Sequence, residues 1–280
     1  MSEVRTIQIA GYRASVAIDQ ADNPQAPTIL ALHGFTGCGQ DFLPLRQSLG
    51  ARAAHWICPD FMGHGESDSP SVLDPYLVPA TVNLIEQARQ MAPDPGRVIL
   101  LAYSMGGRLA MHYLLRAQPL PAVLIGTSPG LATAGERTNR RRADRKWVRL
   151  LSGPNPQNAF STAWERQSLI VPQTQLSEPL RSMIAQRRRN NNPVGLIHSL
   201  MAAGTGALPS LWDKLDRLPQ LILGFGVADR KFGEVAAEMA GLNPHFRLAE
   251  IPGAGHAPHL ERPSAVCRLL EEQLASIAVH

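Results

Sequence analysis

The 280-residue sequence has few of the features that mark secreted, zinc-binding or membrane-spanning proteins. Its three cysteines, Cys38, Cys58 and Cys267, are far apart and form no C-x-x-C pair, which argues against a disulfide framework or a zinc site and predicts buried free thiols. No apolar run reaches the roughly 18 residues that a membrane span needs, and the polar start of the chain lacks the features of a signal peptide. We therefore expect a soluble, cytoplasmic protein without stable membrane association.

Aromatic residues and net charge are also low, at 5% and +4. A nucleic-acid-binding protein usually carries a steeper basic stripe interleaved with aromatic residues, so nucleic acid is not an expected partner. What the chain does have is 44% hydrophobic residues, over a length that can bury one large core. A single α/β domain that carries an insertion is the economical interpretation.

Short apolar runs alternate with segments of helical periodicity along most of the chain. The runs expected to be buried strands are 28–32, 54–58, 98–101, 121–127, 220–225 and 245–251. Helices are expected over 78–91, over 105 to about 117 and over 264–277, and weak alternation over 4–18 predicts an antiparallel hairpin at a sheet edge. This alternation predicts an α/β fold, with a mostly parallel central sheet and helices on both faces.

The character of the sequence changes between about residues 132 and 212. Strand-like runs give way to helical patterns there, and arginines become dense, as in Arg140–Arg142 and Arg187–Arg189. We interpret this segment as a helical cap inserted over the sheet. The predicted organisation is an α/β core of residues 1–131 and 213–280 with a helical cap of residues 132–212.

One serine stands at the junction of a predicted strand and a predicted helix. In the stretch RVILLAYSMGGRLAM (97–111), the apolar run leads to Ser104, and Gly106 and Gly107 follow closely. A serine at a strained strand-to-helix turn needs small neighbours, because backbones approach closely there. The motif G-x-S-x-G describes such a turn, and Ala102 stands here in place of its first glycine. Ser104 is therefore a candidate nucleophile or base.

A glycine-rich loop, HGFTG at 33–37, follows the strand predicted at 28–32. Such a loop leaves backbone N–H groups pointing outward, as an oxyanion site requires, although a simple tight turn explains the glycines equally well. The predicted oxyanion donors are the backbone N–H groups of Phe35 and of Met105, the residue after the candidate serine.

A serine becomes reactive when an imidazole takes its proton and a carboxylate orients the imidazole. Asp229 follows the strand predicted at 220–225 and His256 follows the one at 245–251, so both are expected at the sheet edge that carries Ser104. The order Ser, Asp, His is that of α/β-hydrolases. Competing candidates are Asp60, Asp213 and Glu250 for the carboxylate, His259 for the imidazole, and His33 and His64, which in their glycine loops are expected to orient backbone.

Further motifs lie outside this candidate triad: SPGL at 128–131, RRRADRKW at 140–147, RRRNNNPVGL at 187–196, GTG at 204–206, GFGVADRKF at 224–232 and GHAPHLERP at 255–263. With these motifs the chain, from about residue 27 onward, resembles the 2-succinyl-6-hydroxy-2,4-cyclohexadiene-1-carboxylate synthases, lyases of menaquinone and phylloquinone biosynthesis in the α/β-hydrolase superfamily. The resemblance implies elimination of pyruvate from 2-succinyl-5-enolpyruvyl-6-hydroxy-3-cyclohexene-1-carboxylate. Ser104, activated by His256 and Asp229, would remove a ring proton, with no metal or organic cofactor.

The resemblance also implies substrate-binding residues, because the family's substrate is a small polycarboxylate with three carboxylates. Arginine binds a carboxylate through two parallel N–H donors, and the implied arginines are Arg108, Arg140 and Arg188. Arg108 lies one helical turn after the candidate serine and can face the same cavity, whereas an arginine in a charge run more commonly belongs to a solvated helix face. Trp164 and Gln167 match a tryptophan and a nearby glutamine on the family's cap.

Two residues depart from the family pattern: Ala102 in the turn, and Glu165 where many members have a tyrosine. A carboxylate facing a polyanionic substrate would repel it, so Glu165 turns to solvent, pairs with an arginine, or indicates a different substrate. Two other hypotheses stay open. A carboxylesterase or C–C bond hydrolase of the same fold could act on an anionic substrate, and a binding protein could keep the triad without turnover.

Overall fold

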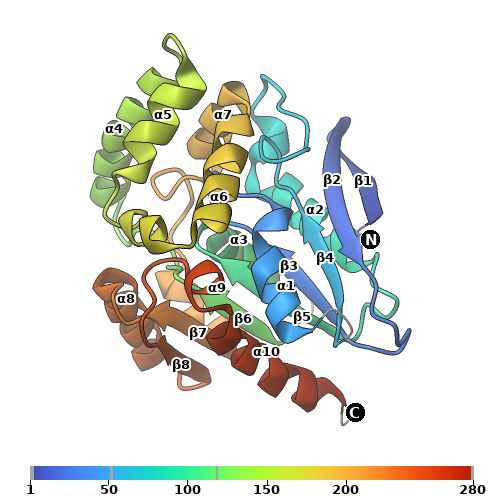
Figure 1. The fold of residues 1–280 in the computed structure, drawn as a ribbon. Helices are drawn as coiled ribbons and strands as arrows, with labels where there is room; N and C mark the ends of the chain where they lie inside the picture. Colours follow the sequence, from blue (N-terminus) through green and yellow to red (C-terminus); the bar gives the residue numbers. More distant parts are fainter. Residues whose placement is uncertain (1–2, 51–52, 118, 279–280) are drawn as a thin grey trace.

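The computed structural model of the chain describes residues 3–50, 53–117 and 119–278 (Figure 1). These residues form an eight-stranded sheet in the order β1-β2-β4-β3-β5-β6-β7-β8. The strands are β1 (Glu3–Ile9), β2 (Tyr12–Asp19), β3 (Thr28–Leu32), β4 (His55–Pro59), β5 (Val98–Tyr103), β6 (Ala122–Ile125), β7 (Leu221–Gly226) and β8 (Phe246–Ile251). Each predicted strand is present, with ends within two residues of those expected.

The sheet is mostly parallel, as predicted. The antiparallel part is at one edge, where β1 pairs with β2 as the predicted hairpin and β2 pairs with β4. From β4 onward neighbouring strands are parallel, through β3, β5, β6 and β7 to β8. The carboxyl ends of β5, β7 and β8 therefore meet at the same edge of the sheet, and this edge is where an open α/β sheet places its ligands.

Alternation along the strands divides the core between the two faces of the sheet, since successive side chains of a strand point to opposite sides. Leu30 and Leu32 pack with the helices α2 (Val78–Arg89), α3 (Met105–Leu114) and α8 (Arg230–Leu242). Ile29 and Ala31 pack with α1 (Leu43–Leu49) and α10 (Pro263–Ala278) on the other face. Both faces are thus covered by helices, which explains why the central strands read as continuous apolar runs.

Four helices lie between β6 and β7: α4 (Ala134–Leu151), α5 (Pro156–Glu165), α6 (Glu178–Asn190) and α7 (Pro193–Ala203). They stand over the sheet in the upper half of Figure 1. Three of them, α4, α5 and α7, share a small hydrophobic core that includes Trp147 and Phe160, while α6 packs through Ile184 against Ala257 and Leu260. The placement agrees with a helical cap, while the boundaries at 132 and 212 stay a prediction. A short 3-10 helix, Trp212–Arg217, crosses the second of them.

Helices α1 and α8, the four-residue helix α9 (Pro258–Glu261) and the 3-10 turns are not among the elements predicted from the sequence. The other 3-10 turns are Gly39–Phe42, Asp74–Tyr76 and Val171–Gln175. For α8 the signal was present, because its buried residues Phe232, Ala236 and Met239 recur at the spacing of one helix face. The seven-residue α1 is too short for such a periodicity to stand out.

The three cysteines are free and buried, which confirms the prediction made from their spacing. Among the described residues, no helix combines the length and the apolar character that crossing a bilayer requires.

We expect acid to destabilise the fold partly through His112, which α3 buries to 2% exposure. Burial, followed by repulsion from Arg116, lowers the pKa of His112 to about 4 from its usual 6.5. The folded state therefore binds fewer protons than the unfolded state between these values, and stability falls as pH drops through this window. Between pH 6.5 and 4.5, the free energy of unfolding should therefore fall by about 1–2 kcal/mol less in His112→Gln than in the unmodified protein.

Urea unfolding at several pH values measures this difference, with His245→Gln at an exposed position as the matched control. Parallel stability curves for His112→Gln and the unmodified protein would contradict the expectation.

Candidate active site

Ser104 lies at the turn between β5 and α3 in a conformation that few residues adopt. Its backbone φ of 52° and ψ of −109° are strained for a residue with a side chain, which costs about 1–3 kcal/mol. The turn is possible because α3 packs closely on its neighbours. A Cβ at Gly106 would lie 2.4 Å from the carbonyl oxygen of Leu32, and one at Gly107 would lie 2.6 Å from Thr127 Cβ. The two glycines after the serine are therefore required by close packing, as predicted.

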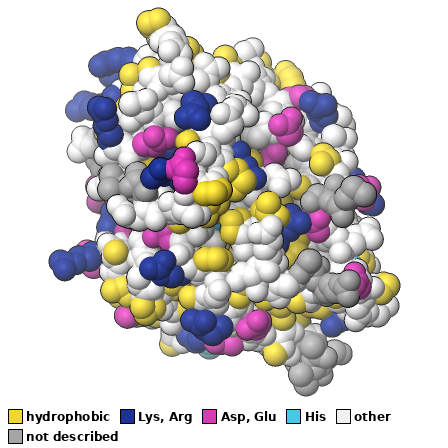
Figure 2. All heavy atoms as spheres, in the orientation of Figure 1, with side chains coloured by type: hydrophobic (Ala, Val, Ile, Leu, Met, Phe, Trp, Pro, Cys, Tyr) yellow, Lys and Arg dark blue, Asp and Glu magenta, His cyan; other side chains and the backbone are white. Residues whose placement is uncertain are grey.

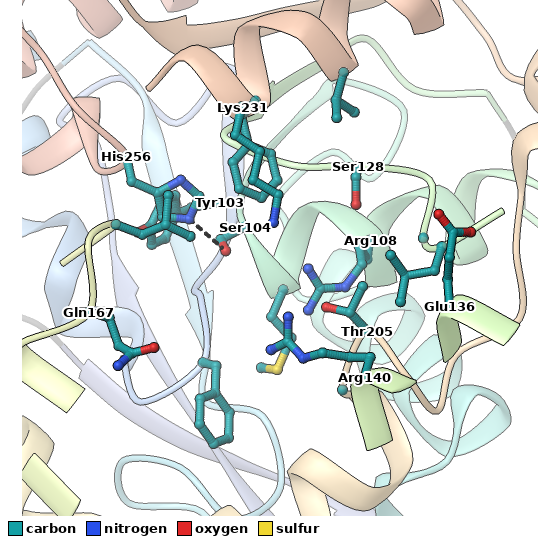
Figure 3. A pocket seen from close by; sticks show the side chains of 18 of the residues that line it. Tyr103, Ser104, Arg108, Ser128, Glu136, Arg140, Gln167, Thr205, Lys231 and His256 are labelled. Carbon is teal, nitrogen blue, oxygen red and sulfur yellow. Dashed lines mark hydrogen bonds between the residues drawn. The ribbon is translucent and has the colours of Figure 1, made fainter. Parts of the chain in front are cut away.

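The structure brings Ser104, His256 and Asp229 together in the order of a catalytic triad. Ser104 Oγ and His256 Nε2 are 3.1 Å apart, and the dashed line in Figure 3 marks this contact. His256 Nδ1 and Asp229 Oδ2 are 2.6 Å apart, so Nδ1–H donates to the carboxylate and Nε2 is left to accept from the hydroxyl. Asp229 also caps α8 by accepting from the backbone N–H of Phe232, which holds the carboxylate in place.

The competing carboxylates have other positions. Asp60 is buried in the loop after β4, where it accepts hydrogen bonds from the backbone N–H groups of Gly39 and Glu66. Burial raises its pKa to about 6 despite these hydrogen bonds. Asp213 lies on the 3-10 helix at 212–217, and Glu250 is exposed on β8. The contact with His256 therefore singles out Asp229.

The competing histidines orient backbone or fill the core. His33 Nε2 accepts from the backbone N–H of Phe61 while its Nδ1 bonds the carbonyl of Gly34, and His64 bonds the carbonyl of Met62. Burial lowers the pKa of His33 to about 3 and that of His64 to about 4, so both stay neutral at physiological pH. His259 is buried, its ring 4.3 Å from that of Tyr103.

Phe35 and Met105 both lie beside the serine, where the predicted oxyanion donors belong. Met105 is the first residue of α3, and the first N–H groups of a helix have no partner within it. The loop that carries Phe35 packs against the serine turn, since a Cβ on Gly34 would lie 3.5 Å from Ser104 Cβ. Both residues line the same cavity as the serine. Their role as oxyanion donors stays a proposal.

A cavity of about 670 Å³ opens at this sheet edge, between the core and the cap. The core contributes Ser104 and His256 to its lining, and the cap contributes Arg140, Trp164 and Gln167 (Figure 3). The Trp164 ring packs 5.3 Å from the ring of Phe35, so this tryptophan links the cap to the glycine loop. Three of the predicted cap residues, Arg140, Trp164 and Gln167, therefore lie on the cavity wall.

Arg108 is the most deeply buried cation of the cavity, at 8% exposure. Among the described residues its Nε atom has no hydrogen-bond partner. Burial, followed by repulsion from Arg140, lowers its pKa to about 10 from 12.5. Arg140 differs in being tethered, because its Nε donates to Asp144 Oδ1 at 2.8 Å. An unpaired, partly desolvated guanidinium that faces a cavity is a binding site for an anion.

Arg188 is placed outside the large cavity, unlike Arg108 and Arg140. It lines a smaller pocket of about 220 Å³, where its Nη1 donates to Glu165 Oε1 at 3.1 Å and its Nη2 donates to Gln173 Oε1 at 3.2 Å. Of the three possibilities for Glu165, the structure shows pairing with an arginine. Ile170 borders both pockets, so the two spaces are neighbours.

The remaining arginines of α4 mostly form a solvated face. Arg142, Arg145 and Arg149 are exposed, and Figure 2 shows Lys and Arg side chains gathered over α4. In one charge run, Arg140 thus turns toward the cavity while Arg142, two residues later, turns to solvent. Residues two positions apart point to different sides of a helix, so only one side of α4 faces the cavity between the cap and the core.

Several residues of the cavity wall were not identified as site residues from the sequence, among them Tyr103, Thr205 and Lys231. Burial raises the pKa of Tyr103, so its phenol stays protonated. Position alone could have indicated Tyr103 and Lys231, because one directly precedes Ser104 and the other follows Asp229 by two residues. Thr205 comes from a loop whose path depends on the cap. Among the described residues, no group of three or more His, Cys, Asp or Glu side chains is arranged to hold a metal ion.

The sequence matches the alpha/beta hydrolase family over residues 29–269. The chain therefore belongs to the alpha/beta hydrolase family, in agreement with the predicted fold class.

Its similarities within that family are more specific. The chain is 36% identical over 273 residues to the putative 2-succinyl-6-hydroxy-2,4-cyclohexadiene-1-carboxylate synthase of Bacillus subtilis (strain 168), covering 95% of this chain and 96% of the relative. It is 32% identical over 241 residues to the synthase of that name from Photorhabdus laumondii, covering 83% and 80%. A solved structure of MenH from S. aureus is 25% identical, with a TM-score of 0.82 and coverage of 94% and 98%. The predicted resemblance to this synthase family is confirmed.

Proposed function

We propose that this protein is a lyase that eliminates pyruvate from 2-succinyl-5-enolpyruvyl-6-hydroxy-3-cyclohexene-1-carboxylate to give 2-succinyl-6-hydroxy-2,4-cyclohexadiene-1-carboxylate. The observation that carries the proposal is the cavity in which the Ser104–His256–Asp229 array meets the buried guanidinium of Arg108, whose Nε atom has no hydrogen-bond partner among the described residues. An esterase for neutral substrates has no use for such a cation. A substrate with three carboxylates does. We place the reaction in the cytoplasm because the similar synthases named above are bacterial enzymes.

The difference between substrate and product specifies which bonds change. The ring double bond at position 3 is replaced by double bonds at positions 2 and 4, so a proton leaves carbon 2 and the enolpyruvyl oxygen leaves carbon 5. The C2–H electron pair forms the 2,3 double bond, and the former 3,4 pair forms the 4,5 double bond. The C5–O pair departs on oxygen as the enolate of pyruvate, which then takes up a proton at carbon.

In this proposal the triad supplies the base. Ser104 Oγ takes the proton of carbon 2 while its own proton passes to His256 Nε2, and the Asp229 carboxylate stabilises the imidazolium that forms. The succinyl carbonyl next to carbon 2 acidifies that proton and receives negative charge as it leaves. The backbone N–H groups of Phe35 and Met105 donate to this oxygen, an interaction worth about 2.7–4 kcal/mol per donor.

The cations of the cavity hold the polycarboxylate in register with the base. Arg108 and Arg140 offer N–H donors toward the space in front of Ser104, where Figure 3 shows both guanidinium groups. Trp164 and Gln167 shape the cap side of this space. Every step uses protein side chains and backbone amides.

A continuous spectroscopic assay tests the function. Purified protein is mixed with the pathway intermediate and pyruvate release is followed, beside a control with p-nitrophenyl esters. We expect rapid pyruvate release and negligible ester cleavage. Ester cleavage without pyruvate release would show a hydrolase on the same fold, and the lyase proposal would be abandoned.

Arg188 enters the proposal through its ion pair with Glu165. Glu165 neutralises the charge of Arg188 there, so a polyanionic substrate in the neighbouring cavity gains little attraction from this guanidinium. Glu165→Gln removes this neutralising charge, so we expect KM to fall about twofold to fivefold with kcat little changed. Glu178→Gln, which removes an exposed carboxylate from α6 of the same cap, is the matched control. An unchanged KM in Glu165→Gln would assign Arg188 to cap structure.

A further inference from the structure

Lys231 is tied to the triad by its place in the chain. α8 begins directly after Asp229, and Phe232 N–H donates to the Asp229 carboxylate. The Phe232 ring also packs 4.6 Å from the ring of His256. Lys231 lies in the chain between Asp229 and Phe232, so the backbone that carries its side chain is fixed relative to the triad.

The Lys231 side chain faces the large cavity and is exposed to its solvent. Figure 3 shows its amino group pointing into the space between Ser104 and Arg108. Within the described part of the chain, this ammonium has no hydrogen-bond acceptor or ion-pair partner; it lies 5.4 Å from the ring centroid of the adjacent Phe232. Beside Arg108 and Arg140, the cavity therefore holds a third cation, and none of the described side chains forms an ion pair with it.

The surroundings of this ammonium favour an added anion. Partial burial, together with repulsion from Arg140 and Arg108, lowers the pKa of Lys231 below its usual value, while Asp229 opposes the shift. Glu136 lines the opposite end of the cavity, and Thr133 N–H and Thr133 Oγ both donate to its carboxylate. An anion that binds between the three cations lowers their mutual repulsion.

The cations are divided between two sides of the cavity. Arg108 and Arg140 lie together on the side away from His256, and Arg140 is held there by Asp144 (Figure 3). Lys231 lies on the side of the triad. A substrate with three carboxylates can therefore place two of them on the arginines and the third, near the reacting serine, on the lysine.

We propose that Lys231 forms the subsite for the carboxylate of the departing pyruvate, whereas Arg108 and Arg140 bind the carboxylates that stay on the ring product. This inference rests on the proposed lyase function. Its physical basis is that the leaving group acquires negative charge as the C5–O bond breaks, next to its own carboxylate. A lysine ammonium, a compact point charge on a flexible stem, can follow this group as it moves away from the ring.

Product inhibition and direct binding test the subsite. In Lys231→Met, which keeps the apolar stem and removes the charge, we expect the inhibition constant for added pyruvate to rise about tenfold, with affinity for the ring product changed less than about twofold. Arg140→Met should show the reverse pattern. Lys231→Arg should retain most of the pyruvate affinity. Ligand-observed NMR with pyruvate alone measures the same affinity without turnover.

Arg230→Met is the matched control, because it removes one positive charge from the same helical turn at an exposed position outside the cavity lining. An unchanged pyruvate affinity in Lys231→Met, or an equal loss in Arg230→Met, would overturn the subsite. Failure of the unmodified protein to release pyruvate from the pathway intermediate would instead overturn the lyase function, so the two failures are distinguishable.

Discussion

Ser104→Ala should abolish turnover while leaving the affinity for substrate nearly unchanged. The variant removes the hydroxyl that His256 activates at 3.1 Å, and general base catalysis of this kind contributes about 10²–10⁴-fold to the rate. We expect kcat for pyruvate release to fall about 10³-fold, since the proposed base that takes the ring proton is removed. The carboxylate-binding cations are untouched, so the dissociation constant measured by calorimetry should change less than about twofold.

Ser128→Ala is the matched control, because Ser128 is a second serine of the cavity wall, whereas the hydroxyl within hydrogen-bond distance of His256 Nε2 belongs to Ser104. Its kcat should stay within about twofold of the unmodified protein. Near-normal turnover by Ser104→Ala would remove the serine from the mechanism and leave His256 as the candidate base.

Arg108→Met should separate stability from activity. Burying this guanidinium costs free energy, because its Nε atom has no partner in the part of the chain that the structure describes, and the lowered pKa of about 10 reflects this cost. Since the folded protein disfavours the charged form, an apolar side chain of similar length should raise the free energy of unfolding by about 1–3 kcal/mol. The same change removes a donor for a substrate carboxylate, so kcat/KM should fall about 10²- to 10³-fold.

Thermal unfolding and steady-state kinetics measure the two effects on the same preparation. Arg145→Met, on the exposed face of α4, should change neither. A lower Tm with unchanged kcat/KM would show that Arg108 supports the fold and does not bind substrate. A gain in stability with a loss of activity is the pattern expected when a site is preorganised for an absent anion.

Much of the fold was accessible from the sequence because its determinants are local. Val98 to Leu101 form a strand because an apolar run suits a sheet covered on both faces. Gly106 follows Ser104 because no Cβ fits against the Leu32 carbonyl. The order of strands then brings Asp229 and His256 to the serine, since the carboxyl ends of parallel strands share one edge.

The positions of the charged cap residues were harder to predict from the sequence, because packing between distant segments decides which of them face the cavity. Arg140 and Arg142 belong to one charge run, yet one lines the cavity and the other is exposed. Arg188 matched a family motif and was predicted to bind substrate, but α6 places it against Glu165. The pairing joins residues 23 positions apart, at a distance that neither helix specifies by itself.

By itself the sequence determined the strand-turn-helix unit around Ser104, the order of the triad and the class of fold, because steric fit and hydrophobic periodicity act over a few residues. Only the tertiary structure decided which cations face the cavity, that Glu165 is paired, and that Lys231 has no ion-pair partner within the described ranges. The physical reason is that the energy of a charge depends on its burial and on its neighbours, and these are set by elements far apart in the chain.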